Sequence, residues 1–260
     1  MGCNPLRTAV LLAAACFLSA QAAAAPAAAA PPEKPGRVLA FSDEFDGDKL
    51  DMERWECESA SPGHIQSSRW PENIKVSGGL LHLVTKKESR GGKEWTTASI
   101  WTRTFRQERG CFEARFRIGG AEGLNNAFWL MTPGKKTDPV HFEIDIVEAH
   151  YPSKVHMNLH NWAGKHWAKA DLWTAPEDLS KDFHVYALEW TEKELVWRFD
   201  GKEIRRMEQS ICRAPAVVRL STAVMPWAGA AAALVGTSMD VDWVRVYKSK
   251  SAGEPSDAGK

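Results

Sequence analysis

The sequence lacks an excess of either charge. Lysine plus arginine and aspartate plus glutamate each number 33 among 260 residues, so the formal net charge is zero. A neutral chain has no net field that would draw it onto nucleic acid or an anionic membrane. We therefore expect no nucleic-acid partner. A neutral partner fits best, although a local basic patch could still hold an anionic one.

Cysteine is scarce as well, and the cysteines present do not fit a metal site. Cys3 and Cys16 belong to an N-terminal segment interpreted below, which leaves Cys57, Cys111 and Cys212. Their spacing matches no zinc motif, so no metal ligands are assigned. An odd number permits one disulfide and leaves one thiol over, and the sequence does not say which pair would form.

Apolar runs long enough to cross a bilayer are absent, so we expect no membrane span. The best candidate, residues 8–20, is too short. It follows Arg7 and ends at Ala20-Gln21-Ala22, a small-x-small cleavage pattern. Residues 1–22 are therefore predicted to be a signal peptide, and the mature chain to be secreted or periplasmic. The residues before Cys16 match a lipoprotein site poorly, so we do not expect a lipid anchor.

The two ends of the mature chain differ in composition from its middle. Residues 23–36 are rich in alanine and proline, which predicts a disordered linker because the prolines interrupt any helix. Residues 249–260 are small and polar and are predicted to be a tail. Between them, residues 37–248 have a length typical of one β-sandwich domain.

A convincing helical pattern of ten or more residues is missing too, which argues against a parallel βαβ fold. Residues 111–118 instead alternate apolar and charged side chains, as a strand with one dry face does. Further strands are predicted at 80–85, 183–190, 195–199 and 239–247. Asp200-Gly201 after the fourth of these is a hairpin turn signal. Many short strands indicate an all-β fold, a two-sheet antiparallel β-sandwich.

Tryptophan is what the sequence has in excess. Twelve tryptophans stand against three tyrosines, and all lie beyond residue 50. Indoles fill cores, and their faces also pack well against the C–H face of a sugar ring, so composition leaves both interpretations open. In the last predicted strand, alternation places Trp243 on the same side as Met239 and Val241.

The residues from His141 to His150 carry the chemistry. On a strand, Glu143 and Asp145 share one face, and the isoleucines beside them point to the core. Glu148 lies five positions after Glu143, so a regular strand would bury its carboxylate at high cost. One extra residue in a β-bulge around Ile146-Val147 would turn Glu148 back to the side of the other two acids.

Three acids on one strand face repel each other, which raises at least one pKa. A retaining glycosidase needs such a pair, one ionised nucleophile and one protonated acid about 5–5.5 Å apart. A solvated acidic edge or a metal site is the alternative. The apolar neighbours, Phe142, Ile144, Ile146 and Val147, argue against a merely solvated edge.

With these residues, the sequence resembles glycoside hydrolase family 16. Residues 143–148, Glu-Ile-Asp-Ile-Val-Glu, resemble the bulged form of its signature. Residues 41–47, 110–115 with 127–130, and 241–247 resemble its opening strand, central block and closing strand. The resemblance implies a jelly-roll, concanavalin A-like sandwich whose concave face holds a substrate cleft.

The resemblance also implies roles. Glu143 would be the nucleophile and Glu148 the acid/base of an endo-acting, retaining hydrolysis, and Asp145 would orient Glu143. No cofactor is required. Some members hold a structural calcium ion on the convex face, and no ligands for one can be assigned here.

Four further residues are predicted to bind substrate. By resemblance, Trp129 lies beneath a sugar near the scissile bond, Asn73 donates to substrate, and His160 reaches the leaving-group side. Trp162, with Trp167 and Trp173, falls in a region we interpret as a loop that could wall the cleft. The alternatives are a core tryptophan for Trp129, a turn asparagine for Asn73, a structural histidine for His160 and packing of the loop for the three tryptophans.

The substrate is predicted to be a β-linked polysaccharide, either a β-1,3-glucan or an agar-type galactan. Before the last strand, laminarinases of the family usually carry a Gly-Gly-Asn-Trp-Pro-Gly-like segment, whereas residues 221–229 here read Ser-Thr-Ala-Val-Met-Pro-Trp-Ala-Gly. Two alternatives remain: a non-catalytic carbohydrate-binding sandwich, and a transglycosylase that uses the same residues. Nothing in the strand pattern points to a partner protein, and we expect a monomer.

Overall fold

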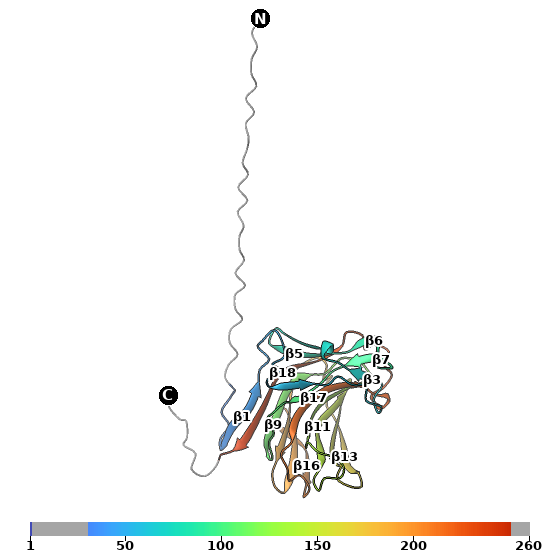
Figure 1. Cartoon of the computed structure of the whole chain (residues 1–260). Helices are drawn as coiled ribbons and strands as arrows, with labels where there is room; N and C mark the ends of the chain where they lie inside the picture. Colours follow the sequence, from blue (N-terminus) through green and yellow to red (C-terminus); the bar gives the residue numbers. More distant parts are fainter. Residues whose placement is uncertain (2–30, 251–260) are drawn as a thin grey trace.

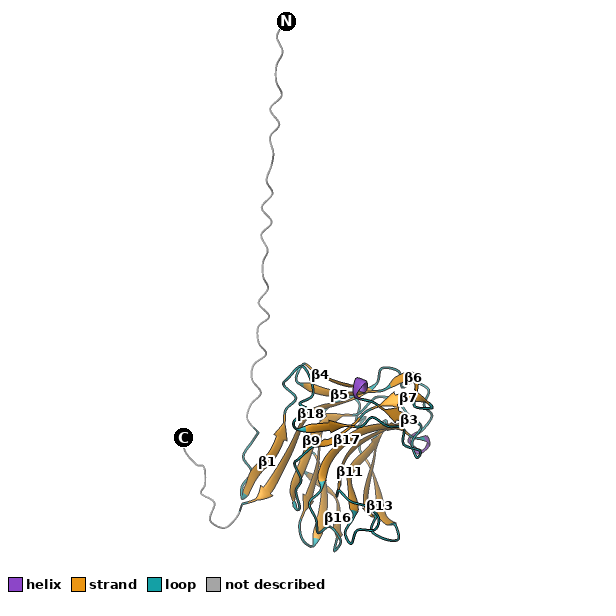
Figure 2. Cartoon of the chain, in the orientation of Figure 1, coloured by secondary structure: helices purple, strands orange, loops and turns teal. Residues whose placement is uncertain are grey.

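Strands dominate the part of the chain that the structure describes (Figures 1 and 2). The computed structural model describes Met1 and residues 31–250. Most of the predicted signal peptide and linker, and the tail from residue 251, lie outside the described residues. Helix in this part is limited to two short 3-10 turns, η1 (Pro71–Asn73) and η2 (Pro226–Ala228). Neither is long and apolar enough to cross a membrane.

One large antiparallel sheet has eight strands, and β18 is its centre. β18 pairs with β9 and β5 and, toward its C-terminal end, with β1. In spatial order the sheet contains β16 (Lys202–Glu208), β15 (Glu194–Phe199), β14 (His184–Trp190), β9 (Gly110–Arg117), β18 (Ser238–Ser249), β5 (Leu80–Val84) and β4 (Ile74–Ser77), with β1 (Arg37–Asp43) beside β18.

The second large sheet has seven antiparallel strands and carries the acidic strand near its middle. In spatial order it contains β13 (Trp167–Thr174), β12 (Lys154–Asn161), β11 (Phe142–His150), β10 (Leu124–Met131), β17 (Val217–Val224), β8 (Ser99–Thr102) and β2 (Trp55–Cys57). A small third sheet adds β3 (Ser67–Arg69), β7 (Lys93–Thr97) and β6 (Lys86–Arg90).

The two large sheets bury their apolar faces against each other. On β9, Phe112, Ala114 and Phe116 are fully buried, as their alternation predicts. Ile144 and Ile146 of β11 belong to the same core cluster from the other sheet. Fully burying such a side chain contributes about 1.5–3 kcal/mol, so this shared core fixes how the sheets pack. The predicted two-sheet β-sandwich is confirmed.

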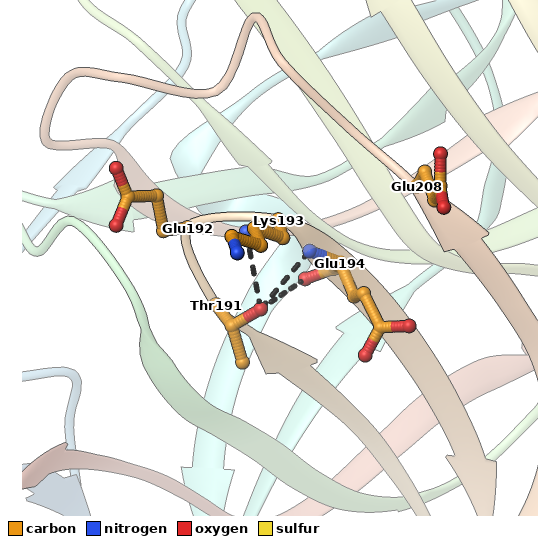
Figure 3. Close-up of a pocket in the computed structure, with 5 residues that line it drawn as sticks. All are labelled: Thr191, Glu192, Lys193, Glu194 and Glu208. Carbon is orange, nitrogen blue, oxygen red and sulfur yellow. Dashed lines mark hydrogen bonds between the residues drawn. The ribbon is translucent and has the colours of Figure 1, made fainter.

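Hairpin turns close the strands at the positions that their residues favour. Asp200 and Gly201 both have positive φ, 45° and 78°, in the predicted turn between β15 and β16. Between β14 and β15, the Thr191 hydroxyl accepts hydrogen bonds from the backbone of Lys193 and Glu194, at 3.3 and 3.0 Å (Figure 3). The carboxylates of Glu192 and Glu208, which line a shallow pocket here, do not point toward each other in this view.

Two predictions of local structure are wrong. A register shift between Val241 and Trp243 in the pairing of β18 with β9 leaves Trp243 half-buried on the outer face, under the Arg245 guanidinium. The region predicted as a loop around Trp167 and Trp173 is strand β13, an edge strand that is mostly exposed and so shows no alternation. The cysteines at 57, 111 and 212 are all free thiols.

Candidate active site

A bulge in β11 decides where its three acids point. Phe128 of β10 pairs with Val147, but the next residue, Trp129, pairs with Asp145, so Ile146 is the extra residue. The pairing with β12 shifts at the same place, between Asp145 and Glu148. The insertion turns Glu148 to the outer face, where Glu143 and Asp145 also lie, while the residues between them stay in the core. The predicted bulge is confirmed.

The core of the sandwich holds this bulge in place. Trp197 of β15, in the opposite sheet, donates a 2.9 Å hydrogen bond from its indole Nε1 to the backbone carbonyl of Asp145. Trp197 is fully buried. A buried carbonyl without a partner would cost about 1–3 kcal/mol, so the indole both fills the core and satisfies a backbone group at the bulge.

The three acids lie in a cleft of about 630 Å³ on the outer face of the seven-stranded sheet. Strand pairing sets out its floor in rows, because directly opposite residues of antiparallel strands point to the same face. In the row of Asp145, Trp129 lies opposite on β10 and Asn158 on β12. His160 pairs with Glu143, and His156 pairs with Glu148.

Each acid is held by neighbours from adjacent elements. Asn125 donates to Glu148 Oε1 at 2.7 Å, and Asn158 donates to Glu148 Oε2 at 2.8 Å, so both oxygens are fixed. The Trp162 indole donates to Glu143 Oε2 at 3.2 Å. His160 Nε2 lies 3.3 Å from Asp145 Oδ2.

Burial and mutual repulsion raise the pKa of all three acids. Burial is the larger cause for Glu143, and the charge of Asp145 adds to it, which raises the Glu143 pKa to about 8. Burial and the charge of Glu148 raise the pKa of Asp145. Burial also raises the pKa of Glu148, against the lowering effect of the Asn125 hydrogen bond. No lysine or arginine in the described part forms a salt bridge with them, so they titrate as a coupled group that holds protons near neutral pH.

The structure brings three of the four predicted substrate-binding residues into the cleft. Trp129, His160 and Trp162 all line it, and Trp129 donates from Nε1 to Ser221 Oγ at 3.1 Å. Asn73 does not. It is fully buried at the end of η1 and donates from Nδ2 to the Val84 carbonyl and the Thr96 hydroxyl, at 2.8 and 3.0 Å. The structural role that the sequence left open as an alternative fits this position, and Asn73 does not line the described cleft.

Several residues that line the cleft or contact its lining were not predicted from the sequence. Asn158 could have been found, because it lies two positions before His160 and therefore on the same strand face. Asn125 carries no such signal. His166 meets His160 through a 3.1 Å contact between Nε2 and Nδ1, and its ring stacks on Trp162 with centroids 4.1 Å apart. Arg219 reaches the floor from β17.

Potential metal ligands gather at two places among the described residues. One group is Glu143, Asp145 and His160 in the cleft, and the other is Glu177, His184 and Asp200. Calcium takes six to eight oxygen ligands, and each group includes a histidine, so neither fits a structural calcium ion. The calcium site therefore stays a prediction without ligands.

Together, the fold and the site define a class: an antiparallel β-sandwich with an outer-face cleft built on a bulged, three-carboxylate strand. The sequence model of the family described as glycosyl hydrolases family 16 matches residues 63–245, most of the chain. This chain belongs to glycosyl hydrolase family 16.

Relatives and solved structures agree with that assignment. A β-glucanase of Rhodothermus marinus is 33% identical over 182 residues, which cover 64% of this chain and 64% of the relative. A κ-carrageenase of Pseudoalteromonas carrageenovora is 27% identical over 267 residues, 82% of this chain and 66% of the relative. The chain thus spans slightly less than two thirds of the length of either relative.

Among solved structures, the catalytic domain of an endo-1,3-β-glucanase (laminarinase) from Thermotoga petrophila RKU-1 superposes with a TM-score of 0.74. The two are 26% identical, and the match covers 83% of this chain and 99% of that one. The sandwich of this chain therefore matches a complete catalytic domain of the family.

Proposed function

We propose that this protein is an endo-acting glycoside hydrolase that cuts a β-linked polysaccharide by double displacement, with retention of the anomeric configuration. One observation carries the proposal: the bulge at Ile146 turns Glu148 into the cleft that already holds Glu143 and Asp145. Two carboxyl groups in different protonation states are what retaining hydrolysis requires.

Glu143 acts as the nucleophile. Its ionised carboxylate attacks the anomeric carbon while the bond to the leaving oxygen breaks, which gives a glycosyl ester on Glu143. The N–H of Trp162 favours the charged form of Glu143. Asp145 is buried beside Glu143, and its Oδ2 lies 3.3 Å from His160 Nε2. Its protonation changes together with that of the two glutamates. Asp145 is thus a positioning residue in this scheme.

Glu148 acts as the acid and then as the base. It first gives its proton to the leaving oxygen, and it then takes a proton from the water that attacks the glycosyl ester and frees Glu143. Asn125 and Asn158 hold both of its oxygens, so the carboxyl group keeps one orientation through both steps.

Names of relatives favour two substrate classes. The printed names of the first relative and of the solved structure refer to glucans, and that of the κ-carrageenase to a galactan. We infer a β-1,3-glucan or a galactan, acted on outside the cytoplasm because of the predicted signal peptide. Trp227 of η2 is 47% exposed, and its ring lies tilted against that of His150, with centroids 4.2 Å apart. It also meets the ring of His156, which pairs with Glu148, so it would contact a bound chain there.

The test is a panel assay of reducing-end release from laminarin, mixed-linkage glucan, agarose, porphyran and carrageenan. We expect one of these to be cut, and Glu143→Gln and Glu148→Gln to abolish the cutting. Binding of a polysaccharide with no release from any of the panel would refute the proposal in favour of a carbohydrate-binding sandwich.

A further inference from the structure

Arg219 occupies a fixed place in the cleft floor, away from the three acids. β17 pairs Arg219 with Trp129 on β10 and with Trp101 on β8, and Trp129 in turn pairs with Asp145. Neighbouring strands lie about 4.8 Å apart, so Arg219 stands about 10 Å from Asp145, two strands across the sheet. It can therefore contact a different sugar of a bound chain from the one attacked.

The guanidinium of Arg219 is held rigidly and keeps a donor unused. Its Cζ lies 4.8 Å from the Trp101 ring centroid and 4.4 Å from that of Trp129, and its side chain is 18% exposed. Its Nε is buried and has no hydrogen-bond partner among the described residues, although buried donors are ordinarily paired. Burial lowers the pKa of Arg219 to about 10, which leaves it protonated at neutral pH.

The positive charge of Arg219 is not matched by a carboxylate of its own. The carboxylate in salt-bridge range is Glu58, whose Oε2 lies 4.0 Å from Nη2, and the charge of Glu143 also acts on Arg219. The same oxygen accepts a 3.0 Å hydrogen bond from Arg69. Two guanidinium groups thus share one carboxylate, and this part of the cleft floor keeps an excess positive charge.

A second cavity continues the cleft at this place and adds to the charge. It measures about 410 Å³, and Arg219 lines both cavities. Its other charged residues are Glu56, Arg103 and Arg106. Arg103 reaches Glu56 at 3.5 Å, whereas Arg106 is exposed and takes part in no salt bridge of the described residues. The charged residues that line this cavity are therefore three arginines and one glutamate.

The substrate groove is therefore polarised. Acids without a lysine or arginine partner among the described residues lie on β11, and excess arginine lies on β17 and in the segment that follows β8, in a chain whose net charge is zero. A guanidinium fork binds planar or tetrahedral oxyanions through two parallel hydrogen bonds, and a neutral hydroxyl does not use the charge. An anionic sugar substituent would be repelled from β11 and attracted to Arg219.

We propose that the cavity bounded by Trp101, Arg106 and Arg219 is a subsite for a negatively charged sugar, one that bears a sulfate ester or a carboxylate, so that the polysaccharide cut by this protein is anionic. The proposal rests on the proposed glycosidase function, whose cleft it extends.

Binding to the full chain tests the subsite without hydrolysis. In the Glu148→Gln background, calorimetry would compare a κ-carrageenan oligosaccharide, the same oligosaccharide after desulfation, and a β-linked glucuronan oligosaccharide. We expect the sulfated chain, the glucuronan chain or both to bind about tenfold more tightly than the desulfated chain at low salt, because charge-assisted bidentate contacts are the strong ones. Which of them binds tells sulfate from carboxylate.

Arg219→Met, added to that background, should remove this preference and leave binding of the desulfated chain within about twofold, because methionine keeps the packing between the indoles. Lys202→Met, at an exposed hairpin, removes the same charge elsewhere and should change nothing. Arg106→Met, at the exposed rim, gives a second variant that needs no core repacking and should reduce the preference about threefold.

Equal affinity for sulfated, carboxylated and desulfated chains, or an equal loss for all three in Arg219→Met, would overturn the subsite. Hydrolysis by the unaltered protein separates this inference from the proposed function. A charge preference with no chain cut rejects the glycosidase alone. Cutting of neutral chains with no charge preference rejects the anionic subsite alone.

Discussion

The outer faces of the two large sheets treat acidic side chains in opposite ways. On the eight-stranded sheet, Asp240 lies 2.8 Å from both Arg117 and His82, Asp242 pairs with Arg115, and Glu113 pairs with Lys34 at 2.5 Å. Burial alone would raise the pKa of Asp240, but hydrogen bonds from Arg117, Ser238 and His82 lower it.

On the seven-stranded sheet, the acids of β11 have amide, indole and imidazole neighbours but, among the described residues, no lysine or arginine in salt-bridge range. Their pKa values rise. Paired acids stabilise a fold, whereas acids that repel each other in a cleft lower its stability and are typical of catalytic sites. The contrast between the two faces identifies the candidate active site without reference to any relative.

The largest expected effect is on hydrolysis. Glu143→Gln and Glu148→Gln should each lower kcat by about a thousandfold or more, because the nucleophile or the acid is lost. Asp242→Asn, an acid of the other face, should leave kcat within about twofold, since its loss affects a surface ion pair. Steady-state rates on the polysaccharide that is cut provide the measurement. Similar losses in all three variants would erase the distinction between the faces.

The pH dependence of hydrolysis sharpens the contrast next. The rate should fall at alkaline pH, because burial raises the pKa of Glu148 and above that pKa this residue loses the proton that the acid step needs. Asp145→Asn removes a charge that raises the pKa of Glu143, so the acidic limb of kcat/KM against pH, where the nucleophile ionises, should move to lower pH. An unmoved limb would mean that Asp145 does not couple to the reacting pair.

The bulge itself can be tested through the core. Trp197→Phe removes the donor to the Asp145 carbonyl and should lower the free energy of unfolding by about 1–3 kcal/mol beyond the loss of packing, with a lower kcat. Trp190→Phe is the matched control, since Trp190 is equally buried but its Nε1 has no hydrogen-bond partner in the part of the chain that the structure describes. Denaturant unfolding and kcat measured on both variants make the comparison; equal effects would remove Trp197 from the account.

The smallest expected effect is on stability, with opposite signs on the two faces. The folded-state pKa of Glu143 is raised, so its contribution is present below about pH 4.5 and is lost as pH rises toward about 8. Glu143→Gln should therefore raise Tm at pH 8 by about 5 °C and change it little at pH 4.5.

Asp240 has a lowered folded-state pKa, so its contribution is present at neutral pH and is lost as pH falls. Asp240→Asn should lower Tm at pH 8 by a few degrees, about what 1 kcal/mol produces in a domain of this size, and less at pH 3. Thermal melts at the three pH values decide both signs. A stabilising Asp240→Asn at pH 8 would contradict the assignment of paired, structural acids.

Local pattern predicted the sandwich and the acidic strand well, because alternation reports burial directly. The bulge at Ile146 was predictable since a regular strand would have buried Glu148 among isoleucines. The shift near Trp243 was not, because a tryptophan is tolerated on either face and no cost marked the irregularity. β13 escaped prediction because both of its faces are largely exposed.

Residues whose place depends on long-range packing could not be predicted. Asn73 is drawn inward by Val84 and Thr96, partners distant in sequence. Arg219 lies in the cleft because β17 pairs with β10 and β8, which the sequence does not reveal. The support of the bulge by Trp197 crosses between sheets and leaves no local signal.

The stereochemistry of the first product tests the central claim most directly. Proton NMR during early hydrolysis of whichever polysaccharide is cut reports the anomer released before mutarotation. Two carboxyl groups brought together by the bulge as nucleophile and acid predict the β anomer first. Initial release of the α anomer would mean a single displacement by water and would contradict the role given to Glu143.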